Sequence, residues 1–184
     1  MRYVLTALLA VVLSACASDG AQVSFSDYTG YSSSIAQYGA RNGTMALAVF
    51  GNPTRADQAT LDAAVADGLR GTHVDRDTVF VPAEPPPMAG YRTVVAFGGA
   101  TQQQICRPDF RPAAAPKAAT ADRLAAAYCL DDQELSYVSA RHGALSGPND
   151  PALHRLLNTM GHELFPLENP NMRDGCAPWT GGCD

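Results

Sequence analysis

Two histidines in one helical pattern, His154 and His162, are the first candidates for metal binding or acid–base chemistry. Leu153 and Leu157 mark the apolar face of this helix, so His154 is predicted on its flank and His162 on the side facing solvent. The two histidines are eight residues apart, which corresponds to about 12 Å along a helix. His-Glu at 162–163 also lacks a second histidine four residues later. We therefore predict a solvated helix face and no metal site.

A serine, a histidine and an aspartate suggest nucleophilic catalysis at first sight. They are Ser136, His142 and Asp132, which lie in or beside a predicted strand. An extended chain holds residues 136 and 142 about 20 Å apart, and the chain lacks a Gly-x-Ser-x-Gly turn. These residues are predicted to be surface polar groups, and no catalytic residue is assigned.

Two loops share single features with ligand-binding motifs. Phe97–Thr101, FGGAT, follows a predicted strand, but glutamines and prolines follow it in place of a glycine-rich helix start, so it is predicted to be a turn. The segment 72–77, THVDRD, carries aspartates without the spacing of a calcium loop. No cofactor or metal is predicted at either loop.

Two further segments suit contacts with partners. The proline-rich run at 82–87 could dock a partner in polyproline form, although a stiff hairpin connection is the favoured reading. Trp179 would be a contact anchor if its loop is exposed, or a cover for the core if the loop folds back.

Four cysteines follow position 16, and their even number suggests two disulfides in an exported protein. Three pairings are possible, and the two that join nearest neighbours are Cys106–Cys129 and Cys176–Cys183. A zinc site is the alternative, but close Cys-x-x-Cys pairs are absent from the sequence.

The fifth cysteine ends a short apolar run at the amino terminus. Arg2 precedes the run 3–13, YVLTALLAVVL, which is too short to span a bilayer and fits a secretory signal. The run ends at Leu13-Ser14-Ala15-Cys16, and this stretch resembles the lipobox of bacterial lipoproteins. The resemblance implies cleavage before Cys16, lipid attachment to its thiol and acylation of the new amino terminus. Ala17 in the next position implies, by the same resemblance, export to the outer membrane.

Composition limits the possible partners. The chain of 184 residues has 13 basic and 18 acidic residues, and loss of residues 1–15 would change the formal net charge from −5 to −6. An acidic chain without a basic run does not suit nucleic acid. The lipid, together with other envelope proteins, is therefore the expected contact.

Hydrophobic periodicity predicts an alternation of helices and strands. Strands are expected at 44–51, 78–81, 91–97 and 135–140, and helices at 31–38, 54–71, 120–128 and 150–165. Residues 17–30 are small and polar and suggest a tether, whereas 98–117 suggest a long irregular connection.

This order predicts an α/β (α+β) two-layer sandwich of the ferredoxin-like split βαβ type with an added C-terminal helix. A three-layer α/β sandwich is the alternative. The expected division is a signal peptide at 1–15, a lipid-anchored tether with a possible short helix at 16–42, one α/β domain at 43–166 and a disulfide-closed tail at 167–184.

Two classes of function fit these observations. The favoured class is a lipid-anchored, non-catalytic envelope lipoprotein that acts as an accessory, assembly or structural component, in the outer membrane and facing the periplasm. The alternative is a small envelope hydrolase or ligand-binding protein. Convergence of polar side chains in one hollow would favour the alternative.

Overall fold

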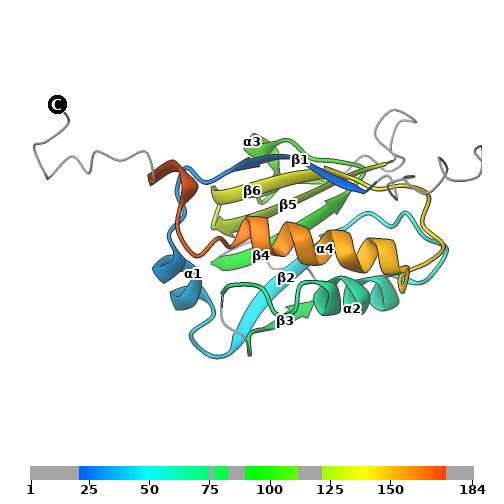
Figure 1. Cartoon of the computed structure of the whole chain (residues 1–184), viewed down its shortest axis with the longest axis horizontal. Coiled ribbons are helices and arrows are strands. Elements are labelled where there is room, and N and C mark those ends of the chain that lie inside the picture. Colours follow the sequence, from blue (N-terminus) through cyan, green and yellow to red (C-terminus); the bar gives the residue numbers. More distant parts are fainter. Residues whose placement is uncertain (1–20, 75–76, 83–89, 112–121, 173–184) are drawn as a thin grey trace, which may run out of the picture.

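The computed structural model describes residues 21–74, 77–82, 90–111 and 122–172, which form one sheet with helices packed on it (Figure 1). The elements are, in chain order, β1 (Gln22–Asp27), α1 (Ser33–Gly39), β2 (Thr44–Phe50), α2 (Gln58–Gly68), β3 (Val79–Pro82), β4 (Tyr91–Phe97), α3 (Gln102–Ile105), β5 (Arg123–Leu130), β6 (Gln133–Arg141), α4 (Pro151–Leu164) and the 3₁₀ turn η3 (Pro170–Met172). Within the described ranges, no helix is long and apolar enough to cross a membrane.

The sheet has six strands in the order β1-β6-β5-β4-β2-β3. Strand β2 runs parallel to both β3 and β4, whereas β4, β5, β6 and β1 pair antiparallel. The α/β class is therefore confirmed as a mixed sheet with four helices. The ferredoxin-like arrangement is not confirmed, because the segment expected to be its second helix is a strand.

That segment is β5, and the predicted helix at 120–128 is wrong for the part that the structure describes. Leu124, Ala127 and Tyr128 have helical spacing, but they belong to the apolar run Leu124–Leu130. All of β5 from Leu124 to Cys129 is buried, because β4 and β6 pair with its edges and both faces of the sheet are covered there. A strand buried on both faces loses its alternating pattern and can be mistaken for a helix.

The expected tether is wrong for Gln22–Asp27, which forms the edge strand β1. This strand pairs with β6 from Gln22 opposite Arg141 to Asp27 opposite Tyr137. Most of its side chains are exposed or half-buried, and Phe25 is 50 % exposed. The strand is thus held largely by backbone pairing, which a hydropathy pattern does not reveal.

Local capping explains where the two long helices begin. Asp57, not Thr54, is the N-cap of α2, and its carboxylate accepts a hydrogen bond from the Thr60 N–H at 2.8 Å. The expected start of α4 is confirmed: Asp150 accepts from the Ala152 N–H at 2.8 Å, and Pro151 takes the first helical position. The short helix expected near Ile35 is also confirmed as α1.

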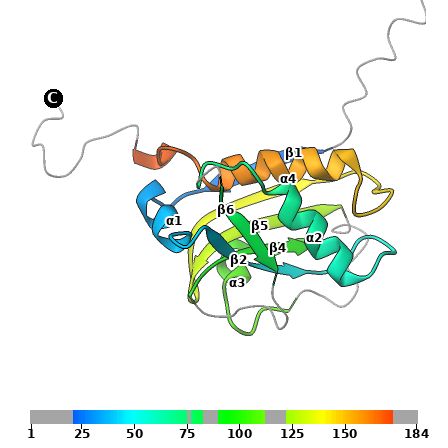
Figure 2. The ribbon, with the colours of Figure 1, turned by 90° about the horizontal axis from the view of Figure 1, so that it is seen from below.

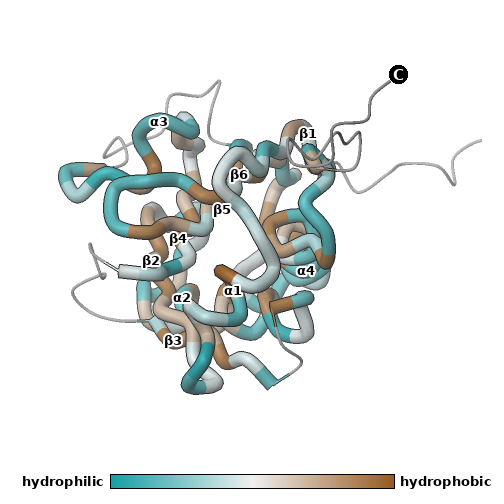
Figure 3. The backbone as a smooth tube through the Cα atoms, turned by 90° about the vertical axis from the view of Figure 1, so that its left-hand side faces the viewer, coloured by the Kyte–Doolittle hydropathy of each residue, from teal (hydrophilic) through white to brown (hydrophobic). Residues whose placement is uncertain are grey.

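The two faces of the sheet are covered differently. Helices α2 and α4 lie side by side across one face, whereas α3 lies on the other (Figures 1 and 2). The end-on view shows the same division, with α4 and α3 on opposite sides of the strands (Figure 3). Large apolar side chains fill the space under α2 and α4: Leu61, Val65, Leu153, Leu157, Met160 and Phe165, among others. The α3 face has mostly smaller ones: Ala48, Val94, Ala96, Ala125 and Ala127, with Ile105 and Phe110 over them.

The Cys106–Cys129 disulfide lies on the α3 face and confirms the first expected pairing. It joins the end of α3 to β5, with a Cα–Cα distance of 5.6 Å. Arg92 stands opposite Cys129 on β4 and is only 1 % exposed. Its guanidinium donates to the carbonyl oxygen of Cys106 at 2.6 Å and to that of Gly90 at 3.3 Å. A covalent bond and a buried arginine therefore hold α3 against the sheet.

Candidate functional site

A hollow of about 420 Å³ lies at one end of the sheet, where β5 begins and β6 ends. We call it the arginine hollow, and the residues of its lining used below are Ser24, Gly99, Arg123, Tyr137, Ser139 and Arg141. It combines side chains from three neighbouring strands with the turn between β4 and α3. Its size lies within the range of small-molecule sites, about 300–1,000 Å³.

The β4–α3 turn forms one wall of this hollow and depends on two glycines. Gly98 and Gly99 have φ values of +87° and +82°, which side chains with a Cβ rarely adopt. A Cβ at Gly99 would also lie 3.2 Å from the Cβ of Arg123. The turn predicted for FGGAT is thus confirmed, and its glycines let Arg123 lie directly against the backbone.

Hydrogen bonds hold the other walls. The Tyr137 hydroxyl donates to the Ala100 carbonyl oxygen at 2.7 Å and so fastens the turn to β6. Burial raises the pKa of the Tyr137 hydroxyl, although Ser139 and Arg123 act in the opposite direction, and the group therefore remains a donor at neutral pH. Ser24 of β1 donates to the Ser139 carbonyl oxygen at 3.1 Å, and the two serine hydroxyl oxygens are 3.3 Å apart.

The hollow is positively charged in an acidic protein. Among the described residues, its lining includes two arginines, Arg123 and Arg141, and no Asp or Glu. Arg141 forms an ion pair with Asp122 at 3.2 Å, whereas Arg123 is exposed and makes no hydrogen bond or ion pair with a residue of the described ranges. Among the described residues, Asp122 offsets the charge of Arg141 and no carboxylate pairs with Arg123.

Sequence reasoning missed this site. Arg123 fell in a segment predicted to be a helix, and Ser24 fell in the expected tether. The signal that was present is the pair of glycines after a strand, but it identifies only one wall. The other walls come together only through the pairing of β5 with β6 and of β6 with β1.

A second polar cluster brings together two histidines from different elements. The ring centroids of His73 and His162 are 4.4 Å apart, beside a hollow of about 960 Å³ that Arg41 also lines. His162 is half-buried, so its predicted orientation toward solvent is wrong. Burial, and secondarily the neighbouring His73, lowers the pKa of His162, whereas Glu163 acts in the opposite direction. Arg41 makes this hollow unfavourable for a metal cation.

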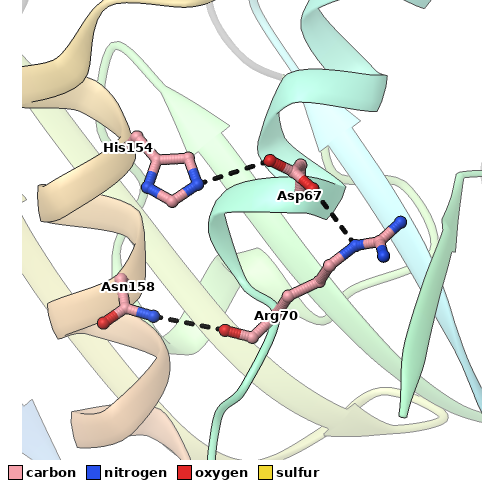
Figure 4. A network of polar contacts seen from close by, with 4 residues as sticks. All are labelled: Asp67, Arg70, His154 and Asn158. Carbon is pink, nitrogen blue, oxygen red and sulfur yellow. Dashed lines mark hydrogen bonds and ion pairs between the residues drawn. The ribbon is translucent and has the colours of Figure 1, made fainter. Parts of the chain in front are cut away.

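His154 instead joins the two long helices (Figure 4). Its Nε2 lies 3.4 Å from an oxygen of Asp67 on α2, and Asp67 also pairs with Arg70 at 3.1 Å. Asn158 of α4 donates to the Arg70 carbonyl oxygen at 3.2 Å. These groups are exposed and connect α2 to α4. Within the ranges that the structure describes, no three His, Cys, Asp or Glu side chains gather as a metal site would require.

Ser136 and His142 are buried, so their predicted surface position is wrong. Ser136 is 0 % exposed and donates to the Leu164 carbonyl oxygen at 2.7 Å, which fixes the end of α4 to β6. The His142 ring packs on Phe97, and its Nδ1 lies 2.8 Å from the Gly143 carbonyl oxygen. Both side chains serve packing, and Asp132 lies exposed in the β5–β6 turn.

Several predicted sites lie outside the described residues. These are Cys16 with its lipobox, the pair Cys176–Cys183, Trp179 and most of the proline-rich run, and two aspartate-loop positions, 75 and 76.

Comparisons with known proteins found no match: no family model, no curated protein and no solved structure matches the chain.

Proposed function

We propose that this protein is a lipid-anchored envelope lipoprotein with a non-catalytic, accessory role, attached through Cys16 and exposed to the periplasm at the outer membrane. The observation that carries the anchor is Leu13-Ser14-Ala15-Cys16 at the end of a short apolar run. The Cys106–Cys129 disulfide supports export, because disulfides persist mainly in oxidising compartments. Attachment by acyl chains needs no membrane-spanning helix.

Metabolic labelling with palmitate tests the anchor. Label is expected to enter the wild-type protein and to be absent from the Cys16→Ser variant, which should also leave the membrane fraction. The Cys176→Ser variant is the matched control, since it removes a cysteine outside the lipobox. Equal labelling of wild type and Cys16→Ser would contradict the proposal.

Co-purification tests the accessory role. The protein is captured from detergent-solubilised envelopes at native levels, and stable envelope partners are expected with the wild type. Absence of any reproducible partner would count against an assembly role.

The arginine hollow favours a second candidate, a ligand-binding lipoprotein. Arg123 has no counter-ion among the described residues, and hydroxyl groups of two strands stand beside it. Binding sites typically combine a concave surface with a few convergent polar groups. Nuclear magnetic resonance titration with a panel of small anionic, neutral and cationic compounds tests this role, and shifts at Gly99 and Ser139 are expected with at least one class.

A further inference from the structure

We propose that the arginine hollow binds a phosphate group, carried by a lipid headgroup or by a small phosphate ester. This inference rests on the ligand-binding role proposed above and names the ligand class. It is drawn from three properties of the hollow: its donors, its charge and its place relative to Cys16.

The donors of the hollow suit a tetrahedral oxyanion. Arg123 and Arg141 are register partners on β5 and β6, so their side chains start from neighbouring positions. A guanidinium binds phosphate through two parallel N–H groups. Ser139 provides a hydroxyl beside the arginines, whereas the Ser24 hydroxyl donates to the Ser139 carbonyl oxygen and holds β1 against β6. Gly99 and Ala100 also line the hollow, and their N–H groups donate to no backbone acceptor among the described residues.

Charge favours an anion over a neutral ligand. The chain has a formal net charge of −5, yet the part of the hollow's lining that the structure describes has arginines and no carboxylate. An acidic protein repels free anions over most of its surface. A positively charged hollow is therefore the place where an anion is expected to bind. Glu134 and Asp27 lie toward the opposite ends of β6 and β1 and do not line the hollow.

The hollow is also close in sequence to the proposed anchor. Gln22, the first residue of β1, is paired with Arg141 and follows Cys16 by six residues. An extended chain spans at most about 3.6 Å per residue, so Gln22 stands within about 22 Å of an anchored Cys16. An anchor at Cys16 would therefore hold the end of the sheet that carries Arg141 within reach of lipid phosphates.

The first arm of the test uses soluble phosphates. The mature chain with Cys16→Ser is titrated with inorganic phosphate and with glycerol 3-phosphate, and amide shifts are followed by nuclear magnetic resonance. Shifts are expected at Gly99, Ala100 and Ser139. Arg123→Gln is expected to weaken binding by roughly tenfold or more. Arg55→Gln, which removes an exposed arginine outside the hollow, is the matched control. Its affinity for phosphate should equal that of the protein with both arginines.

The second arm uses vesicles and identifies the source of the phosphate. The same proteins are sedimented with vesicles of phosphatidylglycerol. Loss of binding in Arg123→Gln but not in Arg55→Gln supports a lipid headgroup. Loss confined to the soluble arm supports a free phosphate ester.

Two results would overturn the inference: no Arg123-dependent binding in either arm, or an equal loss in both arginine variants, which would indicate general charge attraction. Shifts around the hollow with a neutral compound alone would reject phosphate but leave the ligand-binding role standing. Neither result affects the palmitate test of the anchor. Thermal melting of Arg123→Gln checks folding, and an unchanged midpoint is expected because this side chain is exposed.

Discussion

The two faces of the sheet are stabilised by different means. Under α2 and α4, long aliphatic side chains such as Leu157 and Met160 are fully buried, and the helices approach closely where Gly68 meets Leu157. Under α3, most buried residues of the strands are alanines, and a helix of four residues covers them. Burial of apolar surface is the main source of stability on the first face. On the second face, a short helix and small side chains bury little of it.

The difference shows how a small cover can be held in place. The α3 segment is attached by the Cys106–Cys129 bond, by Arg92 and by Gln102, whose side-chain amide donates to Glu134 at 2.7 Å. The first face thus depends on packing, and the second on a few specific bonds. Three variants test this contrast, from the largest expected effect to the smallest.

Leu157→Ala tests the packed face. The side chain is 1 % exposed, so its truncation should leave a cavity and lower the free energy of unfolding by about 2–5 kcal/mol. Urea unfolding followed by circular dichroism measures the change. Leu167→Ala, at a side chain that is 65 % exposed, is the control and should change stability by about 0.5 kcal/mol or less. Similar losses in both variants would mean that packing under α4 is not the main contribution.

Removal of the disulfide by Cys106→Ala with Cys129→Ala tests the bonded face. The bond closes a loop with a sequence separation of 23, and the loss is expected to be about 3 kcal/mol. Unfolding is measured with and without dithiothreitol. The reductant should lower the urea midpoint of the wild type and leave the double variant unchanged. A wild type that is insensitive to reductant throughout unfolding would show that the bond contributes little.

Arg92→Met is expected to have the smallest effect, about 1 kcal/mol, because two opposing terms apply. The variant loses the hydrogen bonds to the Cys106 and Gly90 carbonyl oxygens but also removes a charge from the interior. Chemical denaturation gives the free energy of unfolding. Arg92→Lys, which keeps the charge without the two-pronged donor, should be less stable than Arg92→Met.

Combining Arg92→Met with the cysteine substitutions sharpens the comparison further. Both changes act on Cys106, so their effects should not add. Strict additivity would mean that the arginine and the disulfide hold α3 independently.

Local signals allowed some elements to be predicted and left others hidden. Helix α4 has its own cap, a proline in its first turn and one apolar face, so its sequence alone is sufficient to predict the helix and its start. Strand β5 satisfies both a helical and a buried-strand pattern, and only its pairing with β4 and β6 decides between them. Strand β1 has little apolar signal, because its partner supplies the stabilising bonds. The arginine hollow joins Ser24, Gly99, Arg123 and Arg141, which no linear motif connects.

The burial of the disulfide has a kinetic consequence. Cys106 and Cys129 are 1 % and 0 % exposed, and thiol exchange requires direct attack of a thiolate on one of the two sulfurs. A reductant must therefore wait until this part of the domain opens, so the lifetime of the crosslink is governed by the opening rate. Once formed, the bond therefore stays oxidised for as long as this part of the domain remains closed, even if its surroundings become reducing.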